Sequence, residues 1–76
     1  MWPRRNDPFL PELEGYVAQR VPGYRADKDY LCPDCQQPIV AGSGHVVAWP
    51  EGQVEERRHV HQHCWRLASR RGRIAW

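Results

Sequence analysis

The sequence predicts a small α+β domain, built from a short strand, a β-hairpin and a C-terminal helix. Three observations lead to this fold class. The chain has 76 residues, enough for one domain. Residues 45–49 and 54–60 are rich in β-forming side chains and flank a Pro-Glu-Gly turn, which predicts a hairpin. Residues 62–71 repeat apolar side chains with helical spacing, and Gly72 is a suitable helix stop.

The cysteines and histidines are concentrated in two short stretches of the chain. All three cysteines and three of the four histidines lie in residues 32–35 and 59–64. They read as a C-x2-C pair, a gap of 25 residues and an H-x2-C pair. A tetrahedral Zn²⁺ ion takes four nitrogen or sulfur donors, and a structural site takes all of them from the protein. The spacing predicts one structural zinc ion bound by Cys32, Cys35, His61 and Cys64.

The choice of histidine depends on where the helix begins. His61 and Cys64 are three positions apart, so both can face one ion from the first helical turn. The positive end of the helix dipole also favours a thiolate there. His63 is adjacent to Cys64 and points elsewhere, whereas His59 would serve if the helix began later. His61 is therefore the expected ligand, with His59 and His63 as alternatives.

Other uses of the cysteines fit the sequence less well. A redox dithiol belongs in a longer βαβ unit, and a disulfide scaffold needs an even number of cysteines. Iron stays an alternative to zinc, because thiolate-rich tetrahedra accept both metals. A core this small contributes only about 3–5 kcal/mol unaided, so we expect the metal to decide whether the chain folds.

The sequence indicates a soluble protein of the cytoplasm. Reduced cysteines suit that compartment, and the first residues lack the apolar region of a signal peptide. No apolar run is long enough to span a membrane. Residues 41–44 are glycine-rich but lack the Gly-Lys-Ser/Thr ending of a phosphate loop, so no small-molecule substrate is indicated.

We divide the chain into an irregular N-terminal arm, residues 1–14, and a zinc-finger domain, residues 15–76. The arm contains three prolines, and we expect it to be mobile, with Trp2 and Phe9 as its large anchors. In the domain, residues 16–21 predict a strand and Pro22-Gly23 a turn. Residues 29–31 predict a short strand that leads into the cysteine pair, and Pro38 limits pairing beyond it.

Charge is unevenly distributed along the chain. Residues 32–56 hold four acids and no base, whereas residues 57–76 hold six arginines and no acid. Arginine side chains neutralise phosphates, and exposed aromatic rings stack on bases. Trp49 and Trp76 are therefore also candidates for contacts with nucleic acid. The predicted contacts to nucleic acid or a partner are Arg57, Arg58, Trp65, Arg66, Arg70, Arg71 and Arg73.

The chain has a C-x2-C turn (the zinc knuckle, residues 32–35), then a hairpin, then a helix that carries the last ligand. This order resembles the treble-clef zinc fingers. Residues 32–35 and 61–65 are similar to the poly(ADP-ribose) polymerase-type finger, in which H-x2-C is followed by an aromatic residue. This likeness covers residues 30–70, with a shorter gap here and with His59 in place of an aromatic residue. Residues 46–50 and 58–65 also resemble short uncharacterised zinc-finger proteins of high-GC bacteria.

Two functions follow as hypotheses. One is a module that binds DNA or RNA through the basic C-terminal helix. The alternative is a protein-interaction or assembly module, which would use the apolar tail 74–76 and the proline-rich arm. We do not expect an enzyme, because protein donors fill all four positions around the zinc ion and leave none for water.

Overall fold

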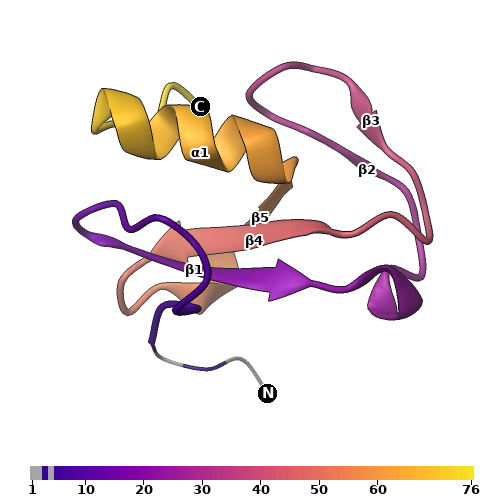
Figure 1. Cartoon of the computed structure of the whole chain (residues 1–76), viewed down its shortest axis with the longest axis horizontal. Coiled ribbons are helices and arrows are strands. Elements are labelled where there is room, and N and C mark those ends of the chain that lie inside the picture. The colour runs from indigo at the N-terminus through magenta and orange to yellow at the C-terminus, as the bar shows by residue number, and fades with distance from the viewer. Residues whose placement is uncertain (1–2, 4) are drawn as a thin grey trace.

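Figure 1 shows a computed structural model of the chain, which describes residue 3 and residues 5–76. The larger sheet contains three antiparallel strands, in the order β1 (Tyr16–Val21), β4 (His45–Pro50) and β5 (Arg58–Val60). A separate antiparallel pair is formed by β2 (Tyr30–Leu31) and β3 (Pro38–Ile39). Helix α1 (Gln62–Arg71) lies over one face of the larger sheet. The fold is therefore small α+β, as expected, and no helix of the described part could cross a membrane.

Strand β4 is the centre of the larger sheet. It pairs with β1 from Tyr16 opposite Pro50 to Val21 opposite His45, and with β5 through Val46 opposite Val60. All its residues except the last are buried. This burial explains the continuous apolar run in the sequence, because a central strand that is covered on both faces has no solvent side.

The main core lies between the sheet and α1. Trp65 of the helix is fully buried there, with Val46 and Val60 from the sheet and Leu10 and Leu13 from the N-terminal segment. A smaller cluster on the opposite face contains Val17, Val47 and Trp49, with Val21 and Val54 packed against it. The sheet therefore buries apolar side chains on both faces.

The second strand of the hairpin is shorter than predicted. Residues Val54–Glu56 form a 3₁₀ turn, and pairing begins only at Arg58. Val54 packs against the cluster that contains Val47 and Trp49. Glu55 and Glu56 are exposed, and glutamate is depleted in strands, so these two residues do not favour a longer strand.

Helix α1 has the predicted boundaries. Gly72 adopts a left-handed φ of 78°, and its N–H donates to the carbonyl oxygens of Ala68 at 2.9 Å and Ser69 at 3.2 Å. This is the conformation for which glycine is favoured after a helix.

The N-terminal segment is irregular but packs against β1. The N–H of Asp7 donates to the carbonyl oxygen of Ala18 at 2.8 Å, and the N–H of Ala18 donates to Oδ1 of Asn6 at 2.9 Å. The expected anchor Phe9 is 70% exposed, so that prediction is wrong. Leu10 and Leu13 are buried instead, while Trp2 lies outside the described residues.

Candidate metal centre

Cys32 and Cys35 lie in the tight turn between β2 and β3. The N–H of Cys32 donates to the carbonyl oxygen of Gln37 at 3.0 Å, and the N–H of Gln36 donates to that of Cys32 at 2.9 Å. Gln36 has a left-handed φ of 63°, which reverses the chain directly after the second cysteine. This turn directs both sulfur atoms to the same point.

His61 and Cys64 lie at the start of α1. His61 is the N-cap residue, with φ −63° and ψ 148°, and its carbonyl oxygen accepts from the N–H of Trp65 at 3.0 Å. Cys64 lies in the first helical turn and is buried. The predicted i, i+3 geometry is therefore present, with the histidine at the cap position and the cysteine inside the helix.

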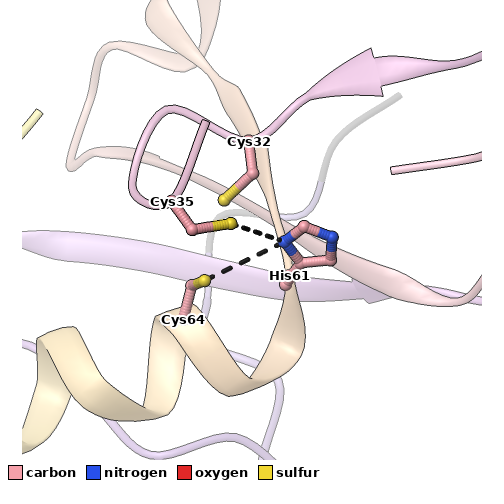
Figure 2. Close-up of side chains that lie close together, drawn as sticks. All are labelled: Cys32, Cys35, His61 and Cys64. Atoms are coloured by element: carbon pink, nitrogen blue, oxygen red, sulfur yellow. Dashed lines mark hydrogen bonds between the residues drawn. The ribbon is translucent and has the colours of Figure 1, made fainter. Parts of the chain in front are cut away.

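The structure brings together the four donors that the spacing predicts. Figure 2 shows their side chains pointing toward one another, and their donor atoms all lie within 4.8 Å of each other. Nδ1 of His61 is 3.3 Å from Sγ of Cys35 and 3.9 Å from Sγ of Cys64. Sulfur and nitrogen donors around a tetrahedral zinc ion are separated by about 3.5–3.8 Å. The cluster can therefore hold a metal ion with only small shifts of its side chains.

A backbone hydrogen bond orients the His61 imidazole. Nε2 of His61 lies 3.2 Å from the carbonyl oxygen of Pro38 in β3. Because a carbonyl oxygen only accepts, Nε2 carries the proton and Nδ1 presents its lone pair to the sulfur atoms. Metal-binding histidines commonly have such a partner on the other ring nitrogen. The alternative donors lie elsewhere: Nδ1 of His59 contacts His45, and His63 is exposed.

The electrostatics of the cluster suit a cation. Burial and the neighbouring sulfur atoms of Cys32 and Cys35 raise the pKa of the Cys64 thiol. Burial also opposes ionisation of Cys32, but backbone N–H groups, first that of Cys35, together lower the pKa of Cys32 to about 7. Three thiols this close cannot all ionise without compensating positive charge. A divalent ion supplies that charge, so the donor chemistry fits a metal.

The predicted contact residues divide into two groups. All six arginines of residues 57–76 are exposed. Trp65, by contrast, is 0% exposed, and its Nε1 donates to the carbonyl oxygen of Pro11 at 2.8 Å. Its assignment to a binding surface is therefore wrong, because a buried ring cannot stack on a ligand. Trp49 is buried as well, and Trp76 packs against the main core. The i, i+3 spacing of Trp65 and Ala68 already indicated a core position.

Sequence reasoning missed a second cluster, in which Tyr30, His45 and His59 are in contact. The signal was weak, because these residues come from three separate strands. Only the position of His45 and His59 on neighbouring strands of the predicted hairpin could have suggested that the two rings meet.

The fold and the site define a small α+β protein with a Cys3His cluster placed to hold one metal ion. The chain belongs to the Rv1322 family, whose model matches residues 11–66. It is similar to the uncharacterized proteins Rv1322 of Mycobacterium tuberculosis (strain ATCC 25618 / H37Rv) and Mb1356 of Mycobacterium bovis. Each is 37% identical over 75 residues, an alignment that covers 93% of this chain and 76% of the relative. No solved structure matches the chain.

Proposed function

We propose that the cluster holds one structural Zn²⁺ ion and that the chain is a treble-clef zinc finger. The order of elements supports this: the cysteine turn between β2 and β3, then the β4–β5 hairpin, then α1 with Cys64. Four protein donors complete a tetrahedron and leave no position for water, so the ion has a structural and not a catalytic role. The site requires reduced thiols, which fits the cytoplasm.

We further propose that this scaffold binds DNA or RNA through its arginines. The observation that carries the proposal is the set of exposed arginines on α1 and directly after it that form no ion pair within the described residues. The ion pair that is present, Arg20 with Asp7, lies on another part of the chain. We call the set of Arg66, Arg70, Arg71 and Arg73 the helix surface.

The physical role of the helix surface is to neutralise phosphates. A phosphate contact from arginine releases condensed counterions, so affinity falls steeply as salt rises. The buried Trp49 and Trp65 offer no face for base stacking. We therefore expect contacts to the sugar–phosphate backbone, with little preference for sequence.

The geometry supports the protein-interaction alternative less well. Ile74 and Trp76 pack against the main core and do not project as a free apolar tail. The N-terminal segment is held against β1 by Asp7. Ile74, Trp76 and Asp7 are therefore held against the rest of the chain, whereas Phe9 of the same N-terminal segment is exposed.

Fluorescence anisotropy with unphosphorylated duplex and single-stranded oligonucleotides tests the proposal. The salt series runs from roughly 50 to 200 mM, where phosphate contacts dominate the affinity. In the triple variant Arg66→Gln/Arg70→Gln/Arg71→Gln, the slope of log affinity against log salt should fall by about 2–3.

The matched control compares two single charge removals, Arg5→Gln outside the helix surface and Arg66→Gln within it. Arg5→Gln should leave the slope nearly unchanged, whereas Arg66→Gln should lower it by about 1, because only Arg66 lies on the helix surface. Equal losses in the two single variants, or no saturable binding of the wild-type protein at low salt, would contradict the proposal. In the latter case a protein partner becomes the better hypothesis.

A further inference from the structure

A chain of three polar rings lies outside the metal cluster. Tyr30 stacks on His59 with ring centroids 3.7 Å apart and an interplanar angle of 11°. Nδ1 of His59 is 2.7 Å from Nε2 of His45, and Nδ1 of His45 is 3.0 Å from the carbonyl oxygen of Ser43. Because the carbonyl oxygen only accepts, Nδ1 of His45 donates to it, and a neutral His45 then accepts from His59. Within the described residues, Nε2 of His59 has no hydrogen-bond partner.

A buried imidazole costs free energy unless its nitrogens are hydrogen-bonded. His45 is 3% exposed, and both of its nitrogens have a hydrogen-bond partner. Aliphatic side chains would fill the same space without polar atoms to satisfy. What the network does achieve is to fix His59, since the hydrogen bond sets its rotation and Tyr30 covers one face. A half-buried side chain held in this way is preorganised for a ligand.

Two hollows meet at this network, because Tyr30, His59 and Arg57 line both of them. The larger has a volume of about 510 Å³, and its wall includes Lys28 and Arg58. Volumes of this order accept small molecules.

The smaller hollow has a volume of about 270 Å³. Arg25 adds positive charge to its wall, Arg20 is there in its ion pair with Asp7, and Val21, Pro22 and Ala26 add apolar surface. Together the two hollows are lined by five cationic side chains and one acid, Glu55.

We propose that this cleft, which comprises both hollows around Tyr30 and His59, binds a phosphate ester of a hydroxyl-bearing molecule. Concave walls that carry an excess of one charge focus the potential, so an anion is favoured. A guanidinium group can donate two parallel hydrogen bonds to two oxygens of one phosphate, and the ammonium group of Lys28 adds a positive charge. The free Nε2 of His59 accepts from a hydroxyl group of the ligand. The apolar residues of the smaller hollow contact the uncharged part of the ligand.

The cleft is independent of the helix surface. Arg25, Lys28, Tyr30 and His59 belong neither to the metal cluster nor to α1. A metal cation does not suit the cleft, because the lining includes five positive side chains and a single carboxylate. The inference therefore does not depend on nucleic-acid binding.

NMR titration of the metal-loaded full chain with ribose 5-phosphate tests the proposal. Resonances of Lys28, Tyr30 and His59 should shift saturably, and free ribose should bind at least about tenfold more weakly because it lacks the charge. Lys28→Gln and Arg25→Gln should each weaken binding by about 5- to 10-fold. Both positions are exposed, so neither change endangers the fold.

The matched control is Arg66→Gln, which removes one charge from α1 and should change the affinity less than about twofold. Shifts that fail to saturate by about 10 mM ligand would overturn the proposal. So would equal effects of Arg66→Gln and Lys28→Gln, since these would indicate a diffuse charge effect and no defined site.

A final comparison identifies the source of the phosphate. An oligonucleotide with a 5′-phosphate is compared with ribose 5-phosphate, both against wild type and Lys28→Gln. Tighter Lys28-dependent binding of the oligonucleotide indicates a strand end, and tighter binding of the sugar phosphate indicates a small metabolite. Failure of both overturns the cleft proposal, while binding of unphosphorylated duplex through the helix surface would be unaffected.

Discussion

Tyr30 and His59 stack 3.7 Å apart, and each stands two residues before a donor of the metal cluster, Cys32 or His61. The two rings come from β2 and β5, which belong to different sheets and share no strand ladder. A metal bound by the cluster would hold these two strands together and support the stack. We therefore expect the cleft around Tyr30 and His59 to depend on the metal.

The choice of ligand histidine can be tested with a pair of variants. His61→Ala removes the nitrogen that faces the sulfur atoms, so the purified protein should lose stoichiometric zinc and its native circular dichroism spectrum. Zinc binding contributes roughly 10–16 kcal/mol to folding in small domains, far more than this core can replace. His63→Ala is the control, since His63 is exposed and outside the cluster, and it should retain one zinc ion per chain.

Elemental analysis and circular dichroism of the two variants, with and without chelator, decide the matter. A folded, zinc-loaded His61→Ala protein would show that another residue completes the site. A chelated wild-type protein that keeps its native spectrum would show that the fold does not need the metal.

Zinc affinity should fall as the pH falls. In the metal-free cluster, burial and the neighbouring sulfur atoms raise the pKa of Cys64, so its thiol is protonated at neutral pH. The pKa of Cys32 is about 7, so that thiol loses its proton near neutrality. Zinc binds the thiolates and must displace these protons. Each displaced proton makes the affinity rise tenfold per pH unit.

Competition titrations with a chromophoric chelator between about pH 6.5 and 8.5 measure this slope. Above the pKa of Cys32, we expect a slope of at least one from Cys64, and a larger slope below it. Calorimetry in two buffers of different ionisation enthalpy should give the same number of released protons. A flat profile would show that the thiols are already ionised without metal.

The metal donors were predictable from the sequence because their spacing constrains them locally. A C-x2-C turn and an H-x2-C pair at a helix start each set the geometry of two donors without reference to the rest of the chain. The strands 16–21 and 45–49 and the helix 62–71 were predictable for the same reason, since hydrophobic periodicity and Gly72 are local signals, although the second strand extends one residue further, to Pro50.

Features that depend on long-range packing were not predictable. Trp65 is hidden by Leu10, Leu13 and Pro11, more than 50 positions away in the sequence. The stack of Tyr30 on His59 likewise exists only once β2 and β5 are brought together. The spacing of Trp65 and Ala68 favours a buried face, but no periodic pattern encodes the residues that cover Trp65 or the stack of Tyr30 on His59. An aromatic residue within a basic helix was therefore mistaken for a binding residue.

Gly23 permits a close approach between two chain segments. A Cβ atom at this position would lie 2.5 Å from the carbonyl oxygen of Gly42. Because this oxygen belongs to the backbone, no change of side-chain rotamer can relieve the clash. Gly23→Ala should therefore destabilise the protein by about 1–3 kcal/mol, as other overpacked sites do. Urea unfolding of the zinc-loaded protein measures the difference.

Gly44 provides the matched control. A Cβ there would meet its nearest atom at 3.6 Å, an ordinary contact. Gly44→Ala should be neutral or stabilising by up to about 1 kcal/mol, because alanine narrows the unfolded ensemble. Equal effects of the two alanines would show that the contact with Gly42 does not oppose a side chain at position 23.

Asp7 attaches the N-terminal segment to β1. Its Oδ1 accepts from the N–H of Phe9 at 3.0 Å, and its Oδ2 accepts from the N–H of Arg20 at 3.2 Å and from Nε of Arg20 at 2.8 Å. Burial opposes ionisation, but these hydrogen bonds together lower the pKa of Asp7. Its carboxylate therefore stabilises the fold above the unfolded pKa of about 3.9, and this contribution is lost as pH falls through the lower folded value.

Asp7→Asn should lower the free energy of unfolding at pH 7 by about 1–2 kcal/mol, toward the low end because the Arg20 side chain is half exposed. Glu12→Gln removes the same charge from an exposed position of the same segment and should cost less than about 0.5 kcal/mol. Urea unfolding with excess zinc, followed by Trp fluorescence, measures both, since Trp65 bonds to Pro11 and reports on this segment. If the two variants unfold alike, the segment is held by Leu10 and Leu13 alone, and the carboxylate is dispensable for the fold.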